Sequence, residues 1–253
     1  MKKTKENNYL YVLITGSSGA IGSAMVDAFR NAGYTVCGLD CVPCVHSQAD
    51  YFIQVDLYSL VSDLKIRQSV LKKVKSWLGG NYLDVLVNNA AYQYVSQNHP
   101  MPVDELTRSY SINVVAPYLL ITEMAEVMTP GYGSVVNIGS VHNRLTKPGF
   151  VAYATTKAAL AALTRGLALD YEDRLRINCI EPASVETSML VDGFKSCPEK
   201  MATLENYHPQ KRIGTPAEIA AMALALSSGD IRFLHGACID MSGGIASRLH
   251  DPA

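Results

Sequence analysis

The sequence has little of three things that would point to a specialised environment: net charge, long apolar runs and internal repetition. Its 22 Lys and Arg residues nearly balance its 23 Asp and Glu residues, so the formal net charge is −1. Such a balance does not favour binding to nucleic acid or to an anionic membrane. The apolar stretch YLYVLITGSSG near the N-terminus is too short for a spanning helix or a secretion signal. We therefore expect a cytoplasmic protein that binds neither nucleic acid nor membranes.

Linkers, repeats and a cysteine framework are also missing. No Pro-rich or Ser-rich tract divides the 253 residues, so we expect one domain, residues 1–253. The six cysteines are scattered, which in a chain without a secretion signal favours reduced thiols. Cys41 and Cys44, with His46 nearby, offer three metal ligands where a structural zinc site wants four. We expect loop cysteines here, and no metal.

What the sequence does contain is an alternation of short apolar runs with helical patterns. Strands are expected at residues 11–15, 35–40, 51–57, 83–90, 133–140, 175–182 and 237–241, and helices near 20–32, 60–78, 104–128, 153–172 and 216–228. The strands are continuously apolar, as expected when helices cover both faces of a sheet. The pattern predicts an α/β fold with a doubly wound parallel sheet, a Rossmann fold with three layers, α/β/α.

Residues 183–215 show no clear period and are rich in Ser, Pro, Lys and Met. An irregular segment of this length inside a compact domain is usually mobile or functional. It follows the sixth expected strand, at the carboxyl edge of the sheet, where ligands bind in this architecture. We predict a substrate lid at 183–215, with a plain surface excursion as the alternative.

A glycine-rich turn, TGSSGAIG at residues 15–22, lies between the first expected strand and helix. Gly16 would let the chain turn sharply, Gly22 would permit close packing, and the helix N-terminus could receive a pyrophosphate. Asp40 ends the second strand, where a carboxylate binds ribose hydroxyls and repels a 2′-phosphate. No Lys or Arg occurs at 31–46. The sequence therefore predicts NAD over NADP, although a tight turn and a strand-end aspartate have structural explanations too.

Tyr153 and Lys157 stand four positions apart on an expected helix. At this spacing their Cβ atoms lie about 5–6 Å apart on one face. Taken alone, such a pair is usually a half-buried tyrosine and a solvated lysine. An adjacent ammonium, however, favours the phenolate and lowers the phenol pKa from its ordinary value of about 10. We expect Lys157 to tune Tyr153 toward the working pH, where it can act as a general acid/base.

Further motifs follow in one order along the chain. They are VDL (55–57), NNAA (88–91), Asn113 in SINVVAPY, Ser140 in VVNIGS, YATTK (153–157) and RINCIEPASVETSM (176–189). Together with the glycine turn and Asp40, this set resembles the short-chain dehydrogenase/reductase family in its compact form, over essentially the whole chain. The resemblance implies an NAD(H)-dependent oxidoreductase that interconverts a secondary alcohol and a ketone.

The resemblance also implies roles for individual residues. Ser140 would hydrogen-bond the substrate oxygen, Asn113 would help to hold a water path from Lys157 to solvent, and Lys157 would also bind the nicotinamide ribose. The expected catalytic residues are Asn113, Ser140, Tyr153 and Lys157. The expected cofactor residues are Gly16, Ser18, Ala20, Ile21, Asp40, Asp56, Leu57, Asn88, Ala90, Tyr153, Lys157, Val185 and Thr187. Family habit further implies a homotetramer or homodimer.

Three departures from the family pattern share one character. Ala20, Ala91 and Ala183 stand where the family most often has glycine, and alanine is disfavoured wherever φ must be positive. Either the backbone tolerates them or dinucleotide binding is weakened. The second reading supports an alternative function, a catalytically silent dinucleotide-sensing or scaffold protein on the same fold. Epimerisation or dehydration is another alternative, but such relatives usually carry an extra C-terminal domain.

Contacts with the substrate are expected from Ser140, His142, Tyr92 and Tyr94. The segments around them, 91–100, 141–150 and 183–212, mix polar and aromatic side chains. This mixture favours a small substrate that is hydroxylated or otherwise polar over a steroid, although loops are polar in most proteins.

Overall fold

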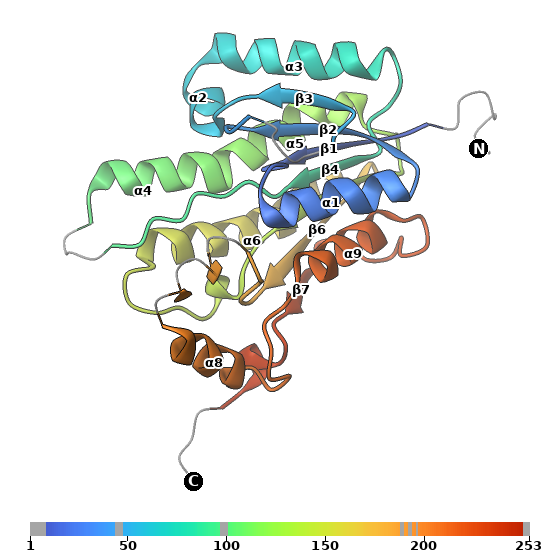
Figure 1. Cartoon of the computed structure of the whole chain (residues 1–253). Helices are drawn as coiled ribbons and strands as arrows, with labels where there is room; N and C mark the ends of the chain where they lie inside the picture. The colour runs from blue at the N-terminus through green and yellow to red at the C-terminus, as the bar shows by residue number, and fades with distance from the viewer. Residues whose placement is uncertain are drawn as a thin grey trace.

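The computed structural model describes residues 9–43, 48–96, 101–187, 190–191, 194–195 and 197–249. In this part of the chain seven strands form one sheet in the order β3-β2-β1-β4-β5-β6-β7, and all six neighbouring pairs are parallel. The strands are β1 Leu10–Thr15, β2 Tyr34–Asp40, β3 Tyr51–Gln54, β4 Val85–Asn88, β5 Gly133–Ile138, β6 Leu175–Pro182 and β7 Cys238–Met241. The chain starts at β1 in mid-sheet, winds outward to β3, then returns to β4. The prediction of a doubly wound parallel sheet is confirmed (Figure 1).

Helices cover both faces of the sheet, as Figure 1 shows. They are α1 Ala20–Asn31, α2 Leu57–Ser62, α3 Leu64–Leu78, α4 Val103–Tyr110, α5 Ala116–Met124, α6 Val151–Tyr171, α8 Pro198–Tyr207 and α9 Pro216–Ser227. A π-helical turn, Ser111–Val115, joins α4 to α5, and short 3-10 turns occur at Ala125–Val127, Val141–Asn143 and Ile245–Ser247. Among the described residues, no helix is both long and apolar enough to cross a bilayer.

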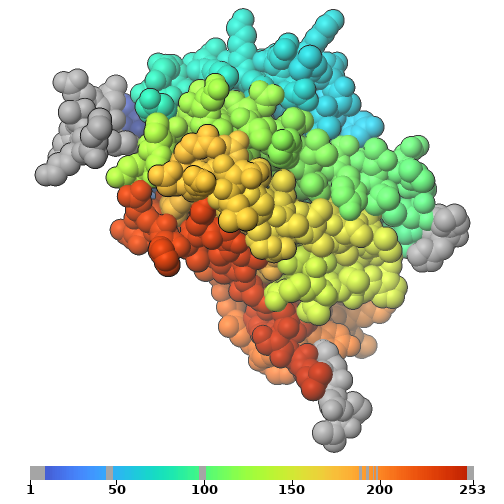
Figure 2. Space-filling view, turned by 180° about the vertical axis from the view of Figure 1, so that it is seen from behind, coloured from blue at the N-terminus to red at the C-terminus, as the bar shows by residue number. Residues whose placement is uncertain are grey.

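Two hydrophobic cores share the sheet because successive strand residues point to opposite faces. Val12 and Ile14 of β1 pack with α1 and α9 on one side, whereas Leu13 packs with α3 and α5 on the other. All three side chains are fully buried. This two-sided burial is the reason that the strands read as continuous apolar runs. The view from behind in Figure 2 shows the face where the yellow-green and yellow segments, which include α6, form the surface.

The element boundaries differ from the sequence prediction where aspartates cap helices. The strand expected at 51–57 ends at Gln54, because Asp56 accepts a hydrogen bond from the Tyr58 amide and begins α2. The helix expected at 60–78 is two helices, since Asp63 caps α3. The helix expected at 104–128 contains the π-helical turn Ser111–Val115. A side chain that accepts from backbone amides satisfies the first turn of a helix, which is why aspartate resets a boundary.

The segment 183–215 is not irregular throughout, because it contains the ten-residue helix α8. The sequence of α8, PEKMATLENY, has no apolar stripe that periodicity could detect. Figure 1 shows α8 beyond the edge of the sheet, beside the chain that follows β7. The segment therefore extends the carboxyl edge of the sheet, where the functional residues gather.

Candidate functional site

A cavity of about 990 Å³ opens at the carboxyl ends of the central strands. It extends from the glycine turn after β1 and the end of β2 to Ser140 after β5, Tyr153 and Lys157 on α6, and the segment around α8. Strand order reverses between β1 and β4, and crevices at such switch points bind ligands in open parallel sheets. Most residues singled out from the sequence line this one cavity: Gly16, Ser18, Ala20, Ile21, Asp40, Asp56, Leu57, Ala90, Tyr92, Ser140, His142, Tyr153, Lys157, Val185 and Thr187.

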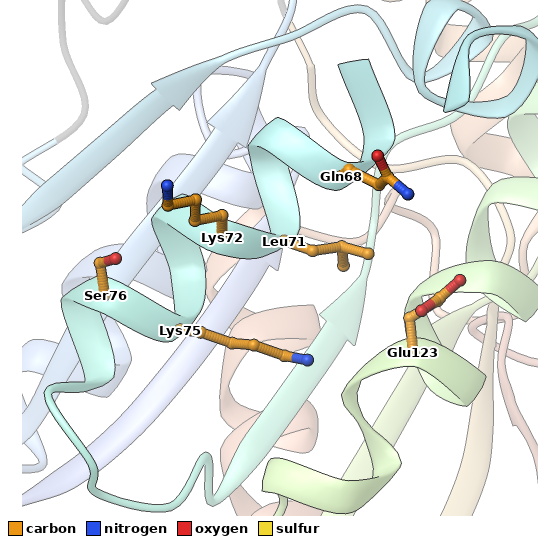
Figure 3. A pocket seen from close by; sticks show the side chains of 6 residues that line it. All are labelled: Gln68, Leu71, Lys72, Lys75, Ser76 and Glu123. Carbon is orange, nitrogen blue, oxygen red and sulfur yellow. The ribbon is translucent and has the colours of Figure 1, made fainter. Parts of the chain in front are cut away.

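A second hollow, of about 490 Å³, lies between α3 and α5 (Figure 3). Gln68, Leu71, Lys72, Lys75 and Ser76 of α3 and Glu123 of α5 border it. None of the residues in the sequence constellation lies there. The large cavity at the sheet edge is therefore the candidate active site.

The glycine turn is held by hydrogen bonds from neighbouring strand ends. The Gly16 amide donates to the Leu39 carbonyl at 2.7 Å, and the Ser18 amide donates to Asp40 Oδ2 at 2.9 Å. From the end of β4, Asn89 Nδ2 donates to the Gly16 carbonyl at 3.0 Å. Gly16 has φ +65°, and a Cβ added at Gly22 would lie 1.9 Å from the Gly16 carbonyl oxygen. Both glycines therefore have the roles that the sequence predicted, a sharp turn and a close approach.

The residues around this turn fit the diphosphate of a dinucleotide. The N-cap of α1, Gly19, supplies no side-chain cap, and the first turn of α1 has no acidic residue. Ser18 lines the cavity, and its buried Oγ has no hydrogen-bond partner among the described residues. Open amides at a helix N-terminus, with an unpaired hydroxyl beside them, favour an anionic group.

The alanine departures bring no backbone strain. Ala20, Ala91 and Ala183 all line the cavity. In the described part of the chain, only Glu172 and Lys211 have positive φ among non-glycine residues. An alanine methyl is therefore sterically allowed at each of the three positions. This removes the strain on which the catalytically silent alternative rested.

At the adenosine end of the cavity, Asp40 and Asp56 both line the wall. Asp56 also forms an ion pair with Arg108 of α4, at 3.3 Å between Oδ2 and the guanidinium. The guanidinium lies over the rings of Tyr58 and Tyr92, 5.1 and 5.2 Å from their centroids. Sequence reasoning missed Arg108, because only the fold brings it to a carboxylate 52 positions earlier in the chain.

At the other end of the cavity, Ser140, Tyr153 and Lys157 come together from β5 and α6. The Ser140 Oγ donates to the Pro182 carbonyl at 3.4 Å and accepts from the His142 amide at 3.2 Å. Lys157 is 2% exposed, and its Nζ donates to the Ile138 carbonyl at 2.7 Å. The same Nζ lies 5.5 Å from the centroid of the Tyr153 ring. The tyrosine and the lysine thus share one helix face, as their spacing predicted.

The titration of this pair differs from the sequence prediction. Burial raises the pKa of Tyr153 to about 12, although a hydrogen bond with the Ser140 side chain opposes the rise. Burial also lowers the pKa of Lys157 to about 8. Burial therefore disfavours the charged forms of both groups in the free protein. The direction of the Tyr153 shift is opposite to the expectation that Lys157 tunes the phenol toward the working pH.

Asn113 lies in the π-helical turn but does not line the cavity. Its Oδ1 accepts from the Tyr92 amide at 2.7 Å, and its Nδ2 donates to the Tyr92 carbonyl at 2.9 Å and to Thr156 Oγ1 at 3.0 Å. These bonds tie the segment after β4 to α6. These contacts make Asn113 a residue that positions Tyr92 and α6, and its part in a water path stays a prediction.

His142 belongs to an aromatic group beside Tyr153. Its ring stacks on Phe150 with centroids 4.9 Å apart and meets Tyr153 edge-on at 5.5 Å. Burial, and then the charge of Lys147, lower the pKa of His142 below its ordinary value. The ring is therefore neutral near pH 7 and forms a rigid wall next to the reacting groups. Phe150 gave no sequence signal as a site residue.

Two of the predicted site residues, Asn88 and Tyr94, are not part of the described cavity wall. Asn88 does not line the cavity; it is 3% exposed, and its Nδ2 donates to Asn137 Oδ1 at 2.8 Å. Its neighbour Asn89 is the one that holds the glycine turn. Tyr94 also lies outside the cavity wall, and Tyr92 lines it with a hydroxyl already bonded to Glu105 at 2.8 Å. The side chains of adjacent residues at a strand end point in opposite directions, so Asn88 contacts Asn137 and Asn89 contacts the glycine turn.

Metal ligands were not expected, and Cys44 and His46 lie outside the described residues. The described chain does bring Cys179, Glu181 and Cys238 together, with possible ligand atoms within 4.8 Å of one another. However, Asn143 and Arg144 already contact the two oxygens of Glu181. These contacts satisfy the carboxylate, and a guanidinium beside it repels a cation. We assign no metal to this cluster.

Comparisons with known proteins agree with the geometry. A short-chain dehydrogenase/reductase family model, described as enoyl-(acyl carrier protein) reductase, matches residues 16–246. Protein FixR of Bradyrhizobium diazoefficiens is 34% identical over 253 aligned residues, covering 92% of this chain and 85% of that protein. The chain belongs to the short-chain dehydrogenase/reductase family.

Other members of the family extend this comparison. Glucose 1-dehydrogenase 2 of Bacillus subtilis is 29% identical over 247 aligned residues, covering 92% of this chain and 93% of that protein. The ligand-free structure of Thermoplasma acidophilum aldohexose dehydrogenase superimposes with a TM-score of 0.88 at 26% identity, covering 96% of each chain. This protein is accordingly an oxidoreductase of a family that uses NAD(P).

Proposed function

We propose that the protein is an NAD(H)-dependent oxidoreductase that interconverts a secondary alcohol and a ketone on a small, hydroxylated substrate. The observation that carries the proposal is the convergence of Ser140, Tyr153 and Lys157 at one end of a cavity whose other end fits a dinucleotide.

The chemistry follows from what each group can do. Bound NAD would supply the hydride acceptor, held by the glycine turn, Asp40 and the Lys157 ammonium. Tyr153 would take the hydroxyl proton of the substrate in oxidation and return it in reduction. Ser140 Oγ would donate to the substrate oxygen where charge develops. Lys157 would stabilise the phenolate, and its buried position makes that charge act in a medium of low dielectric.

We further propose that NAD is preferred over NADP. Asp40 ends β2 in the cavity wall, where its carboxylate would bind ribose hydroxyls and repel a phosphate. Arg108 is a cation in the same cavity, but Asp56 already pairs with it. Titrations should show that NADH binds at least about tenfold more tightly than NADPH. Asp40→Ala should bring the two dissociation constants closer together. Tighter binding of NADPH to the unmodified protein would contradict the preference.

Three broader expectations remain proposals. The segment 183–215 would act as the substrate lid of a single domain, since Leu190, Phe194 and Leu204 line the cavity from it. The protein would work in the cytoplasm. A homotetramer or homodimer would form through α5 and α6, which expose Tyr118, Val151 and other apolar side chains. Light scattering that shows a monomer would exclude the assembly.

The proposed function is tested by substituting Tyr153→Phe, which removes the hydroxyl and keeps the ring. Oxidation and reduction of a panel of polyols, hydroxy acids and ketones would be followed by NADH absorbance. Turnover should fall by about 10²–10⁴-fold, the usual contribution of a general acid/base, while NADH affinity stays within about twofold of the original value.

Two results would contradict the proposal. Full turnover by Tyr153→Phe would exclude the tyrosine as the acid/base. NADH binding with no turnover of any alcohol or ketone would favour the catalytically silent alternative. An enoyl thioester belongs in the panel, because the matching family model carries that description; turnover of it alone would replace alcohol oxidation with reduction of a carbon–carbon double bond.

A further inference from the structure

His208 is a polar residue of the cavity that neither the catalytic group nor the cofactor region uses. It forms the C-cap of α8, is 1% exposed, and lines the cavity together with Leu204 one turn earlier. A histidine this deeply buried normally pairs both ring nitrogens. The pairing here is incomplete.

The hydrogen bond of one ring nitrogen defines what the other can do. His208 Nδ1 lies 2.9 Å from the Leu204 carbonyl oxygen. A carbonyl oxygen only accepts, so Nδ1 carries the hydrogen, and in the neutral ring Nε2 is left as an acceptor. Nε2 is buried and has no hydrogen-bond partner among the described residues. A buried acceptor without a partner is unfavourable, so the site favours a ligand that donates a hydrogen bond.

The position of this ring is set by packing from two sides. The Leu204 bond ties it to α8, and the loop after β7 covers it. A Cβ added at Gly243 would lie 3.5 Å from His208 Cδ2, and the Gln210 amide donates to the Gly243 carbonyl at 3.3 Å. The acceptor is therefore held in a defined place rather than carried on a free loop, as a specificity-determining group requires.

Among the residues that the structure describes, the lid segment and the C-terminal turn bring no carboxylate to the cavity wall. Leu190, Phe194, Leu204 and Ile245 supply apolar side chains there, and Ser184 and Thr187, just after β6, supply hydroxyls. The carboxylates among the described cavity residues are Asp40 and Asp56, both at the adenosine end. A ligand atom that meets the free Nε2 of the neutral ring must carry a hydrogen, and it is favoured on an uncharged wall when it brings no charge of its own. A neutral hydroxyl fits both conditions.

We propose that His208 Nε2 accepts a hydrogen bond from a second hydroxyl of the substrate, so that the enzyme selects secondary alcohols that bear another hydroxyl on an apolar carbon frame. This inference rests on the proposed alcohol dehydrogenase function and names the substrate class. Ser140 and Tyr153 bind the reacting oxygen, and His208 binds the distant one.

Two variants that differ by one methylene group test the role of Nε2. In His208→Asn the side-chain amide reaches only the position of Nδ1, so the bond to Leu204 is kept and the second acceptor is lost. In His208→Gln the longer amide reaches the position of Nε2 and provides a carbonyl oxygen. Because both variants are neutral amides, a difference between them reports the acceptor rather than general damage to the fold.

The measurement compares kcat and KM for cyclohexanediols with those for cyclohexanol, and for glucose with those for its deoxy derivatives. The unmodified enzyme should prefer the hydroxyl-rich member of a pair by at least about tenfold in kcat/KM. His208→Asn should abolish the preference through KM, and His208→Gln should keep part of it.

Three results would decide against the inference. One is a preference that survives in His208→Asn, and another is an equal loss in the Asn and Gln variants. The third is absence of a preference in the unmodified enzyme with turnover intact. If the unmodified protein turns over no alcohol, the proposed function fails instead. In that case the inference is tested by the rise in melting temperature that a diol causes with NADH present. His208→Asn should remove this rise, and an unchanged rise in the variant would contradict the inference.

Discussion

The two ends of the cavity are built in different ways. The cofactor end comes from short local patterns: a glycine turn, a strand-end aspartate and a helix N-terminus, joined by backbone hydrogen bonds such as Gly16 to Leu39. The substrate end comes from side chains far apart in sequence, His142, Phe150, Leu204 and His208, which meet only in the fold. A ligand common to many enzymes is thus bound by local backbone geometry, and a specific one by tertiary packing.

Of the substitutions that test this difference between the two ends of the cavity, the one with the largest expected effect on folding stability is in the glycine turn. In Gly22→Ala the new Cβ would lie 1.9 Å from the Gly16 carbonyl oxygen, so the turn must move. Overpacking usually costs about 1–3 kcal/mol. Because the clashing atom belongs to the backbone, which moves less easily than a side chain, we expect the free energy of unfolding to fall by about 3 kcal/mol or more. Urea denaturation without cofactor measures it.

Gly19→Ala is the matched control for this substitution. Its new Cβ would lie 3.5 Å from the same oxygen, which is an ordinary contact, and its φ of −73° suits alanine. The stability loss should stay below about 1 kcal/mol, the usual cost at an N-cap. Equal losses in the two variants would show that the close approach does not organise the turn.

A smaller and opposite effect is expected at the catalytic end, from Lys157→Met. Burial lowers the pKa of Lys157 from 10.5 to about 8, so the buried ammonium destabilises the free protein by about 3 kcal/mol at pH 7. Loss of the bond to Ile138 offsets about 1 kcal/mol. The variant should therefore be more stable by about 2 kcal/mol at pH 7, although less active. Lys75→Met, at an exposed position of α3, should change stability little.

The pH dependence of the free energy of unfolding is an independent test of the burial of Lys157. Below pH 8 the lysine is protonated in both states, and the folded state bears the full cost. Between about pH 8 and 10.5 the unfolded chain binds the extra proton, so the unmodified protein should gain stability relative to Lys157→Met as the pH rises. The raised pKa values of the buried Cys37 and Cys179 thiols act in the opposite sense above pH 9, and that of Tyr153, about 12, does so above pH 10. These groups are common to both proteins, so equal slopes of the two stability curves between pH 8 and 10 would contradict the burial argument.

The sequence predicted the fold, and the segments that line one end of the cavity, for the same physical reason. Continuous apolar strands reveal a two-sided sheet, and Gly16 and Asp40 stand at positions that local geometry determines. Prediction failed where side-chain direction or tertiary burial decides. Asn89 rather than Asn88 holds the turn, Arg108 reaches Asp56 across 52 positions, and burial reverses the expected pKa of Tyr153. None of these leaves a pattern in neighbouring residues.

The central claim is that the Lys157 ammonium makes proton transfer by Tyr153 possible. The direct measurement is the pH profile of kcat/KM for alcohol oxidation in the unmodified enzyme and in Lys157→Met, with NADH affinity recorded for both. We predict that Lys157→Met lowers the rate by at least about 100-fold and moves the ionisation that limits it to higher pH. An unchanged rate with an unchanged profile would contradict the account.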